Sequence, residues 1–507
     1  MLTLAAVDIG ANSVRLKVAR LERHRMQVVQ EDREVTRLGE SVFRTGLLDP
    51  KALHATVKIL QRFHKICQTH GASAVRVVAT SALRDARNAS AFLNWARSTT
   101  GWRVEVISGL EEGRLIHLGV ISGTRLRASK MLLIDLGGGS CEVTVSAQGQ
   151  IRQLYSLPIG AVRLTQEFLR RDPPKQKELT RLRSFIAEEI GRYQQRLLKD
   201  RVTTVLATSG TPAALAGAWH GRESLPGDSS MVPARGVAQL AAKLSKMTAA
   251  ERRVIPGIGP RRAEIIVAGA WVFAELMDRL KLPGFRYSPL GLRDGVLAQM
   301  AADYGPSEQM RKRIASERSS TLLNAGEHYG VDQRFAQHVR DLAVELFRRL
   351  APVHELPPDY SDWLAAAAML HEVGSYLNRA GRHRHTHYIV ANSEMFGYTL
   401  EQRRIIAAIA RYVGKSRPSP ADRPVALVPA LDRPFIPKAV ILLRLARALD
   451  QGRRRAVSGI DVRVQDDKVI LRVRARRSGA ELEIWALEKE APYFRELFGR
   501  DLVPLLS

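Results

Sequence analysis

Two short glycine-rich segments, each led by an aspartate, carry the strongest chemical signal in the chain. They are Asp8-Ile9-Gly10-Ala11-Asn12-Ser13 and Asp135-Leu136-Gly137-Gly138-Gly139-Ser140. Glycine tolerates positive φ and leaves backbone N–H groups uncovered, so such a turn can surround phosphate oxygens while the leading carboxylate holds a cation. A single Asp-x-Gly turn is common in ordinary hairpins, but two copies in matching surroundings predict a pair of phosphate loops across one cleft.

The residues around each loop predict the elements that position it. Apolar runs at 4–7 and 131–134 precede the loops. The alternating apolar residues that follow are Val14, Leu16 and Val18 after the first loop and Cys141, Val143 and Val145 after the second. Alternation with a period of two residues is typical of β-strands. We therefore predict that each loop is the tight turn of a β-hairpin.

The hairpin register distinguishes the two loops chemically. The residue two positions after each loop serine lies on the same strand face as that serine, and these residues are Arg15 and Glu142. The predicted cleft then has a phosphate-holding side at Arg15 and a metal or water side at Glu142. Arg15→Ala should chiefly raise KM, and Glu142→Gln should chiefly lower kcat. A surface ion pair is the alternative role for Arg15.

A helix start between the two loops offers a general base. Ser108 and Glu111 follow an apolar strand pattern at 104–107 with the spacing of a capping box. The next residue, Glu112, has no such structural role, and in the cleft it can accept a proton from water. A solvated first-turn carboxylate, favoured by the helix dipole, is the alternative.

Two other predicted strands, at 75–79 and 202–207, also lead into helix starts. Arg84 in the first of these helices adds a fixed positive charge beside free backbone N–H groups. Gly210 and Thr211 open the second and can contact phosphate. The alternatives are a surface ion pair for Arg84 and an ordinary N-cap for the second helix.

These segments together resemble the exopolyphosphatase/guanosine pentaphosphate phosphatase family of the actin-like ATPase and sugar-kinase superfamily. Leu157-Pro158-Ile159-Gly160 and Gly291-Leu292-Arg293-Asp294-Gly295 extend the match. The resemblance implies hydrolysis of a terminal phosphoryl group with Mg²⁺, Glu112 as catalytic base, and Asp135 and Glu142 as catalytic, metal-associated carboxylates. It implies phosphate contacts from Asp8, Asn12, Ser13, Arg84, Gly137, Gly138, Gly139 and Ser140; Gly10, Arg15, Gly210 and Thr211 complete the expected phosphate-binding set.

In some of these relatives a pair of glycines stands where this chain has Ser209-Gly210. Serine narrows the conformational freedom of that turn, so we expect a weaker phosphate contact there.

The composition favours an anionic partner. The chain has 507 residues, with 78 Lys and Arg against 51 Asp and Glu, a formal charge of +27 and a pI near 10.6. Such a charge attracts nucleic acid, a membrane surface or polyphosphate, although it also fits a generally basic proteome. Two cysteines exclude a disulfide framework. The longest apolar run, 265–274, is well short of the ~20 residues that a membrane helix needs, so we expect a soluble, cytoplasmic protein.

The predicted fold class is α/β, with two actin-like (ribonuclease H-like) α/β domains at 1–127 and 128–305. Strand patterns alternate with helical ones through this part of the chain. A helical, HD-like domain is predicted at 306–455, where strand signals are scarce. A small β-rich domain with an antiparallel sheet is predicted at 456–507.

The helical region resembles the HD phosphohydrolase superfamily in the placing of His338, His371, Glu372 and Asp450. By that resemblance these residues stand where the superfamily has its metal ligands, but Glu372 replaces an aspartate. The extra methylene displaces the carboxylate oxygens, so we expect a degenerate site.

Basic residues cluster beyond these positions. His383, His385 and His387 alternate with Arg382, Arg384 and Thr386. We interpret this run as a basic, solvated patch, with a metal site as the alternative.

The sequence therefore predicts an exopolyphosphatase that releases orthophosphate from the end of inorganic polyphosphate. A guanosine pentaphosphate 5′-phosphohydrolase would use the same centre and is the alternative substrate assignment. A kinase or ATPase of the same superfamily is disfavoured, because Glu112 is placed to activate water and the chain shows no adenosine signature. A non-catalytic phosphate or alarmone sensor is the alternative of another class. A homodimer is implied by the resemblance alone.

Overall fold

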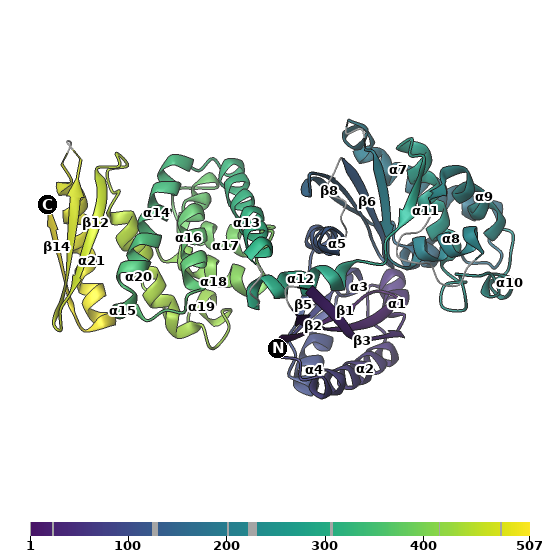
Figure 1. Ribbon diagram of the computed structural model, residues 1–507, viewed down its shortest axis with the longest axis horizontal. Helices are drawn as coiled ribbons and strands as arrows, with labels where there is room; N and C mark the ends of the chain where they lie inside the picture. The colour runs from purple at the N-terminus through teal and green to yellow at the C-terminus, as the bar shows by residue number, and fades with distance from the viewer. Residues whose placement is uncertain are drawn as a thin grey trace. The chain divides into compact units, whose positions relative to one another are not determined.

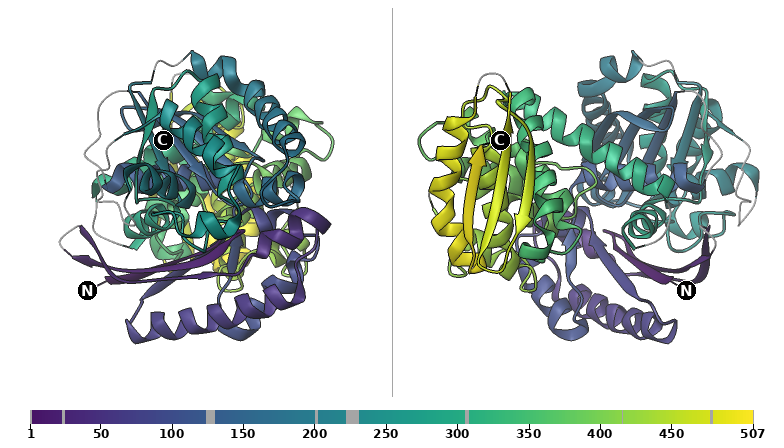
Figure 2. Two further views of the ribbon diagram at one scale, coloured as in Figure 1. Left: turned by 90° about the vertical axis from the view of Figure 1, so that its right-hand side faces the viewer. Right: turned by 60° about the vertical axis from the view of Figure 1, so that its left-hand side comes forward.

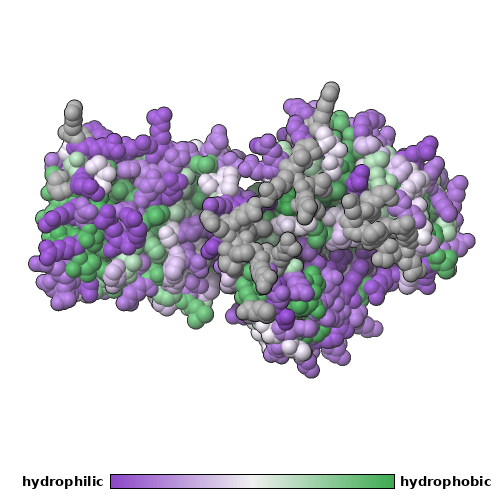
Figure 3. All heavy atoms as spheres, in the orientation of Figure 1, coloured by the Kyte–Doolittle hydropathy of each residue, from purple (hydrophilic) through white to green (hydrophobic). Residues whose placement is uncertain are grey.

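The computed structural model describes residues 2–22, 25–123, 130–199, 202–221, 231–304, 308–414, 416–476 and 479–506. The chain divides into two compact units, Met1–Lys312 and Arg313–Ser507. Each unit has its own buried apolar core. Within the described residues, no helix has the length and apolar character needed to cross a membrane. Figure 3 shows hydrophilic residues spread over the visible face of each unit.

The first sheet of the first unit has the strand order β3-β2-β1-β4-β5. Its strands are β1 (Leu2–Ile9), β2 (Ser13–Glu22), β3 (Arg25–Val35), β4 (Ala74–Ala79) and β5 (Val104–Val106). The helices in this segment are α1 (Leu38–Thr45), α2 (Pro50–Thr69), α3 (Ser81–Asp85) and α4 (Ala89–Thr100). Figure 1 shows α2 and α4 together on one side of this sheet.

The second sheet has the order β10-β11-β9-β6-β7-β8. Its strands are β6 (Met131–Leu136), β7 (Cys141–Ala147), β8 (Gln150–Leu157), β9 (Thr204–Thr208), β10 (Val232–Pro233) and β11 (Gly284–Tyr287). Its helices are α6 (Ala161–Phe168), α7 (Gln176–Leu198), α8 (Gly210–His220), α9 (Ala234–Leu244), α10 (Ala249–Arg253) and α11 (Ile266–Arg279).

The two sheets repeat one topology, so the duplication extends well beyond the loops. In each, three consecutive strands form an antiparallel meander, and the first of the three pairs in parallel with a later strand. Both predicted hairpins are confirmed, with Asp8 opposite Arg15 and Asp135 opposite Glu142. Each turn is closed by the same bond, from the glycine N–H to the serine carbonyl, at 3.1 Å in the first loop and 3.0 Å in the second.

Two helices, α5 (Gly109–Gly123) and α12 (Leu292–Tyr304), cross through a contact that requires glycine. A Cβ added to Gly295 would lie 1.7 Å from the Leu115 carbonyl oxygen, so only glycine allows this approach. Beside the crossing, the buried Arg114 donates two 2.8 Å hydrogen bonds to Glu111 and a third to Gln299. These contacts fix the first turn of α5, and α12 packs against β1 of the first sheet.

Replacing Gly295 with alanine should lower the free energy of unfolding by about 1–3 kcal/mol, because the new methyl group must displace backbone atoms of α5. The matched control is Gly191→Ala in α7, where an added Cβ meets nothing within 4 Å. That change should raise stability by roughly 0.5–1 kcal/mol. Denaturant unfolding of both variants checks this, and equal stability of the two would contradict the packing argument.

The second unit is helical before its small C-terminal sheet. Its helices are most of α13 (Glu308–His328), then α14 (Gln333–Arg349), α15 (Ala351–His354), α16 (Tyr360–Leu370), η1 (Val373–Tyr376), α17 (Arg382–Asn392), α18 (Leu400–Arg411), α19 (Arg423–Ala426), η2 (Arg433–Phe435), α20 (Ile436–Ala448) and α21 (Glu481–Phe498). The sheet comprises β12 (Val457–Val464), β13 (Lys468–Ala475) and β14 (Asp501–Leu506).

The prediction that this sheet is antiparallel is wrong for one strand pair. β12 and β13 are antiparallel, but β13 and β14 are parallel. The reason is α21, which lies beside the strands (Figure 2) and provides the long crossover that a parallel pair requires. The predicted boundaries between the four domains remain predictions.

Candidate active site

One cleft in the first unit collects both glycine loops. Its volume is about 550 Å³. The predicted site residues that line it are Asp8, Gly10, Asn12, Ser13, Arg15, Glu112, Asp135, Gly137, Gly138, Ser140 and Gly210. The loops therefore face a common space, as their duplication suggested.

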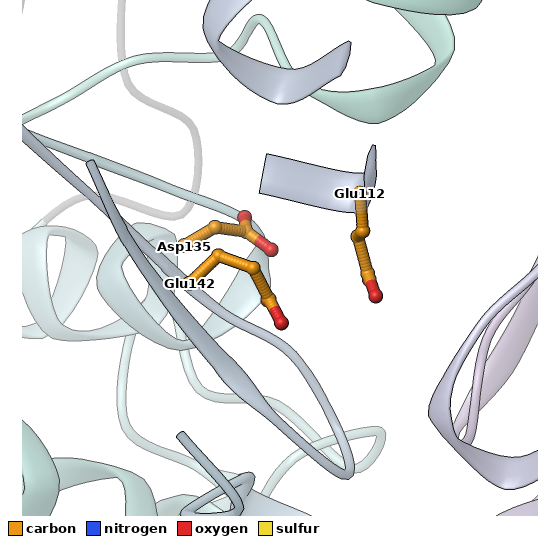
Figure 4. Close-up of side chains that lie close together, drawn as sticks. All are labelled: Glu112, Asp135 and Glu142. Carbon is orange, nitrogen blue, oxygen red and sulfur yellow. The ribbon is translucent and has the colours of Figure 1, made fainter. Parts of the chain in front are cut away.

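Three buried carboxylates meet beside this cleft. Asp135 is the penultimate residue of β6, Glu142 lies opposite it near the start of β7, and Glu112 lies in the first turn of α5. Each offers one oxygen, and the three oxygens all lie within 4.8 Å of one another. Figure 4 shows Asp135 and Glu142 side by side on neighbouring strands, with Glu112 facing them from another segment.

The cluster of Glu112, Asp135 and Glu142 is electrostatically unfavourable without a cation. Burial raises the pKa of Asp135 to about 7, and the Glu112 charge adds to this rise. Burial, with Glu112 and Asp135 nearby, also raises the pKa of Glu142 well above its usual value. Asp135 Oδ1 and Glu142 Oε2 are buried and make no hydrogen bond. Oxygen atoms of this kind, clustered and unpartnered, fit a hard divalent cation such as Mg²⁺.

Arg84 connects the general-base candidate to the second loop. Its guanidinium donates to Glu112 Oε2 at 2.9 Å, to the Ile107 carbonyl at 2.8 Å and to Ser140 Oγ at 3.2 Å. Glu142 is oriented separately by Ser156, whose hydroxyl donates to Glu142 Oε1 at 2.7 Å. Burial raises the pKa of Glu112, and Arg84 opposes this rise because its charge stabilises the anionic form. Arg84 thereby fixes the orientation of the Glu112 carboxylate.

Ser209 adopts a backbone conformation that glycine normally occupies. Its φ is 77° and its ψ is −174°, a combination that costs other residues about 1–3 kcal/mol. The Ser209 side chain hydrogen-bonds Asp135 and thereby opposes the rise in the pKa of that carboxyl. The residue with the strained backbone, Ser209, is thus also the one that hydrogen-bonds Asp135.

Sequence reasoning missed most of a guanidinium wall on the same cleft. Arg33, Arg261, Arg262 and Arg293 line the cleft together with the predicted Arg15. Arg33 lies directly beside Arg15 in the register of β2 and β3, so recognising β3 as the third strand would have found it. Arg293 lies within a segment that carried the family resemblance. Arg261 and Arg262 precede α11 and show no local signal.

The charge of the guanidinium wall is compensated only in part, by Glu31 at 3.7 Å from Arg293 and by Asp8 on the same lining. Burial and the neighbouring Arg15 lower the pKa of Arg33 to about 9. Arg33 Nε and one of its terminal nitrogens are buried without a hydrogen-bond partner. Arg262 is placed against Gly210, because a Cβ there would lie 1.3 Å from the Arg262 guanidinium. A polyanion with several phosphates would supply the missing acceptors.

Some predicted site residues lie outside the lining of the cleft. Arg84 donates a hydrogen bond to Glu112, which lines the cleft. Glu142 lies opposite Asp135, which also lines it. The Gly139 carbonyl accepts a 2.8 Å hydrogen bond from Arg163, and a Cβ on Gly139 would meet Ser81. Thr211 is buried against Gly269 and lines a small adjoining cavity.

Comparison with protein families matches residues 17–303 to the Ppx/GppA phosphatase family and residues 318–491 to Ppx/GppA phosphatase, domain III. The chain belongs to the Ppx/GppA phosphatase family. Exopolyphosphatase 1 of Mycobacterium tuberculosis is 32% identical over 298 residues, which cover 58% of this chain and 87% of that protein. A guanosine-5′-triphosphate,3′-diphosphate pyrophosphatase of Pseudoalteromonas atlantica is 27% identical over 400 residues, covering 79% of this chain and 77% of that protein.

Solved structures agree with this family membership. The Aquifex aeolicus Ppx/GppA family member matches with a TM-score of 0.52 and 28% identity, covering 60% of this chain and 99% of its own. An exopolyphosphatase from Cytophaga hutchinsonii matches in fold with a TM-score of 0.56 at 24% identity, covering 59% of this chain and 97% of its own. The predicted architecture is confirmed: two mixed α/β sheets, a helical region and a small C-terminal sheet.

The four HD-like residues lie in the domain III region, and three of them are engaged in part by other groups. His371 Nδ1 lies 2.7 Å from the Ala368 carbonyl oxygen, and Asp450 accepts a 2.9 Å hydrogen bond from the Arg455 N–H. Glu372 pairs with Arg453. His338 Nε2, His371 Nε2 and Asp450 Oδ2 are buried without a hydrogen-bond partner. In the described part of this unit, no three candidate ligands offer atoms within 4.8 Å of one another, and the degenerate site stays a prediction.

The basic histidine run is partly misread from sequence. His383, His385 and His387 lie on the helix α17. His383 is half-buried, and burial lowers its pKa to about 4, so its ring is neutral at pH 7. The interpretation as a fully solvated basic patch is therefore wrong for His383, because helix geometry turns this ring inward.

The buried His371 should contribute a loss of stability as the pH falls from 6.5 to 4. His371 is 2% exposed, and burial lowers its pKa from 6.5 to about 4. In this window His371 binds more protons in the unfolded chain than in the folded one, so its contribution to stability is lost as the pH falls. We expect His371→Asn to reduce this loss by about 1–3 kcal/mol. Melting temperatures of both proteins from pH 7.5 to 4.5 check the prediction, which parallel curves would contradict.

Proposed function

We propose that this protein is a cytoplasmic exopolyphosphatase that hydrolyses the terminal phosphoanhydride bond of inorganic polyphosphate and releases orthophosphate. The observation that carries the proposal is the pairing, on one cleft, of three buried carboxylates with a wall of five guanidinium groups. The reacting phosphate at the chain terminus needs the carboxylates, and the rest of the phosphate chain needs the guanidinium groups.

The chemistry follows from the positions of these groups. Mg²⁺ held by Asp135 and Glu142 would offset negative charge on the transferred phosphoryl group. Glu112, fixed by Arg84, aligns a water and accepts its proton as the water attacks phosphorus in line with the leaving phosphate. The backbone N–H group of Gly138 and the hydroxyl of Ser13 contact the phosphate oxygens. Arg15 and Arg33 hold the remaining chain.

The lining of the cleft favours an inorganic chain over a nucleotide. Among its described lining residues Tyr287 is the single aromatic, and arginine, glycine and serine predominate. Guanosine pentaphosphate remains the alternative substrate, since a relative of 27% identity is named a guanosine-5′-triphosphate,3′-diphosphate pyrophosphatase. Both substrates use the same carboxylates. We also propose, from the family resemblance alone, that the protein forms a homodimer.

The decisive experiment measures orthophosphate release from long-chain polyphosphate and from guanosine pentaphosphate with Mg²⁺. We expect turnover of polyphosphate with the higher kcat/KM. Preference for guanosine pentaphosphate would establish the alternative. Salt-dependent binding of both substrates without turnover would instead identify a phosphate or alarmone sensor.

Arg15→Ala should raise KM for polyphosphate about tenfold or more and change kcat little. Arg15 lies on the chain-holding side, and a hydrogen bond to a charged group contributes roughly 1.5–3 kcal/mol. Arg20→Ala is the matched control, because Arg20 lies on the same strand outside the cleft lining. Steady-state kinetics over a range of polyphosphate concentrations provides the measurement. A loss confined to kcat would overturn the assignment.

A further inference from the structure

A second large cavity, of about 660 Å³, lies within the domain III region of the second unit. Its walls come from α17, the segment after α18, α20 and α21. The charged arginine, lysine and glutamate side chains that line it are Arg382, Arg417, Arg444, Arg447, Lys489 and Glu490. Five cations therefore face one carboxylate, an imbalance that favours an anionic occupant.

The carboxylates nearby leave several of these cations uncompensated. Glu490 pairs with Arg444 at 2.7 Å, and Arg417 pairs with Glu496, which lies outside the lining. Among the described residues, no carboxylate lies within ion-pair distance of Arg382, Arg447 or Lys489. Burial and the neighbouring Arg382 charge both lower the pKa of Arg447. A bound phosphate group would relieve this repulsion and satisfy the guanidinium donors.

Aromatic side chains distinguish this cavity from the cleft of the first unit. Trp485 is 49% exposed at the lining, and Lys489 Nζ lies 3.6 Å from the centre of its ring. Tyr493 is 3% exposed, and its hydroxyl is buried without a hydrogen-bond partner. The lining also includes apolar Val413, Ala448 and Ala486. A planar ring system with a polar edge would use these surfaces, whereas an inorganic phosphate chain would leave them uncovered.

We propose that this cavity binds a nucleoside polyphosphate. The phosphates lie among Arg382, Arg447 and Lys489, and the base lies against Trp485 and its apolar neighbours. The volume falls within the range of small-ligand sites, and the mixture of a few fixed charges with apolar and aromatic walls is typical of them. This binding site is separate from the carboxylates of the first unit, so its existence does not depend on the proposed hydrolysis.

The test is a titration of the full-length chain carrying Glu112→Gln, which suppresses turnover at the cleft. GTP and inorganic tripolyphosphate are the probes, followed by calorimetry and by tryptophan fluorescence. We expect Arg447→Ala to weaken GTP binding tenfold or more, and Trp485→Phe to abolish the fluorescence change. Arg384→Ala is the matched control, since Arg384 is exposed on the same helix as Arg382 and does not line the cavity.

Three results would overturn the proposal. GTP affinity unchanged in both Arg447→Ala and Arg382→Ala would exclude binding in this cavity. A GTP affinity that depends on Arg15 alone would place the nucleotide in the cleft of the first unit. Tripolyphosphate binding that equals GTP binding, with the same loss in Arg447→Ala, would exclude a role for the base. Melting temperatures confirm folding of each variant, and Arg382→Ala replaces Arg447→Ala if the latter is unstable. None of these readouts uses phosphate release, so they are independent of the proposed hydrolytic activity.

Discussion

Glu112→Gln is expected to lower kcat for orthophosphate release by about 10²–10⁴-fold while changing KM little. The amide has the same shape as the carboxylate, and its oxygen can still accept the 2.9 Å hydrogen bond from Arg84. What the variant loses is the ability to take a proton from water. Steady-state release from polyphosphate at saturating Mg²⁺ gives both constants, and thermal unfolding should show a folded protein.

The adjacent residue provides a matched control for this prediction. Glu111 accepts two 2.8 Å hydrogen bonds from Arg114, which is buried at the crossing of α5 and α12. Glu111→Gln should therefore lower the free energy of unfolding by about 3 kcal/mol, because it leaves a buried charge without its partner. Its folded fraction should retain kcat within a few-fold. Equal losses of kcat in the two variants would contradict a specific role for Glu112.

Glu142→Gln is expected to lower kcat by about 10²–10³-fold, since it removes charge where the transferred phosphoryl group needs stabilisation. The Mg²⁺ concentration for half-maximal activity should rise about 10–100-fold. Activity measured across a Mg²⁺ titration separates the two effects. A variant with reduced affinity for polyphosphate but normal kcat and Mg²⁺ dependence would place Glu142 on the substrate side instead.

Stability provides an independent readout of the same carboxylate group. In metal-free buffer, Glu142→Gln should melt at a higher temperature than the wild type, because it removes a carboxyl whose ionisation is opposed by burial and by Glu112 and Asp135. Added Mg²⁺ should raise the melting temperature of the wild type and have less effect on the variant. Glu189→Gln is the control, since Glu189 is a buried carboxylate in α7 that pairs with Arg192 at 2.9 Å. It should lower stability and leave the response to Mg²⁺ unchanged.

Local features of the site could be predicted from sequence because their causes are local. Alternating strands around a glycine turn determine a hairpin, and both predicted hairpins form, with Asp8 opposite Arg15 and Asp135 opposite Glu142. The start of α5 was also predictable, and Ser108 Oγ does accept the Glu111 N–H at 3.1 Å. The repeat of the loops correctly indicated a cleft between two related halves.

Interactions between distant segments were beyond such reasoning. Arg261 and Arg262 reach the cleft from the segment before α11, and nothing in their neighbours marks them as site residues. The hydrogen bond from Arg84 to Glu112 joins residues that lie 28 positions apart in the sequence. In the second unit, the direction of β14 depends on how α21 returns the chain to the sheet.

The sequence by itself determined the two Asp-Gly hairpins, the family and the candidate base, because each depends on residue types at short and regular spacing. Only the tertiary structure decided that the loops share their cleft with five guanidinium groups and that three carboxylates meet within 4.8 Å. The physical reason is that burial and proximity arise from packing between segments far apart in the chain. Packing also creates the unpaired charges that a metal ion and a phosphate chain would neutralise.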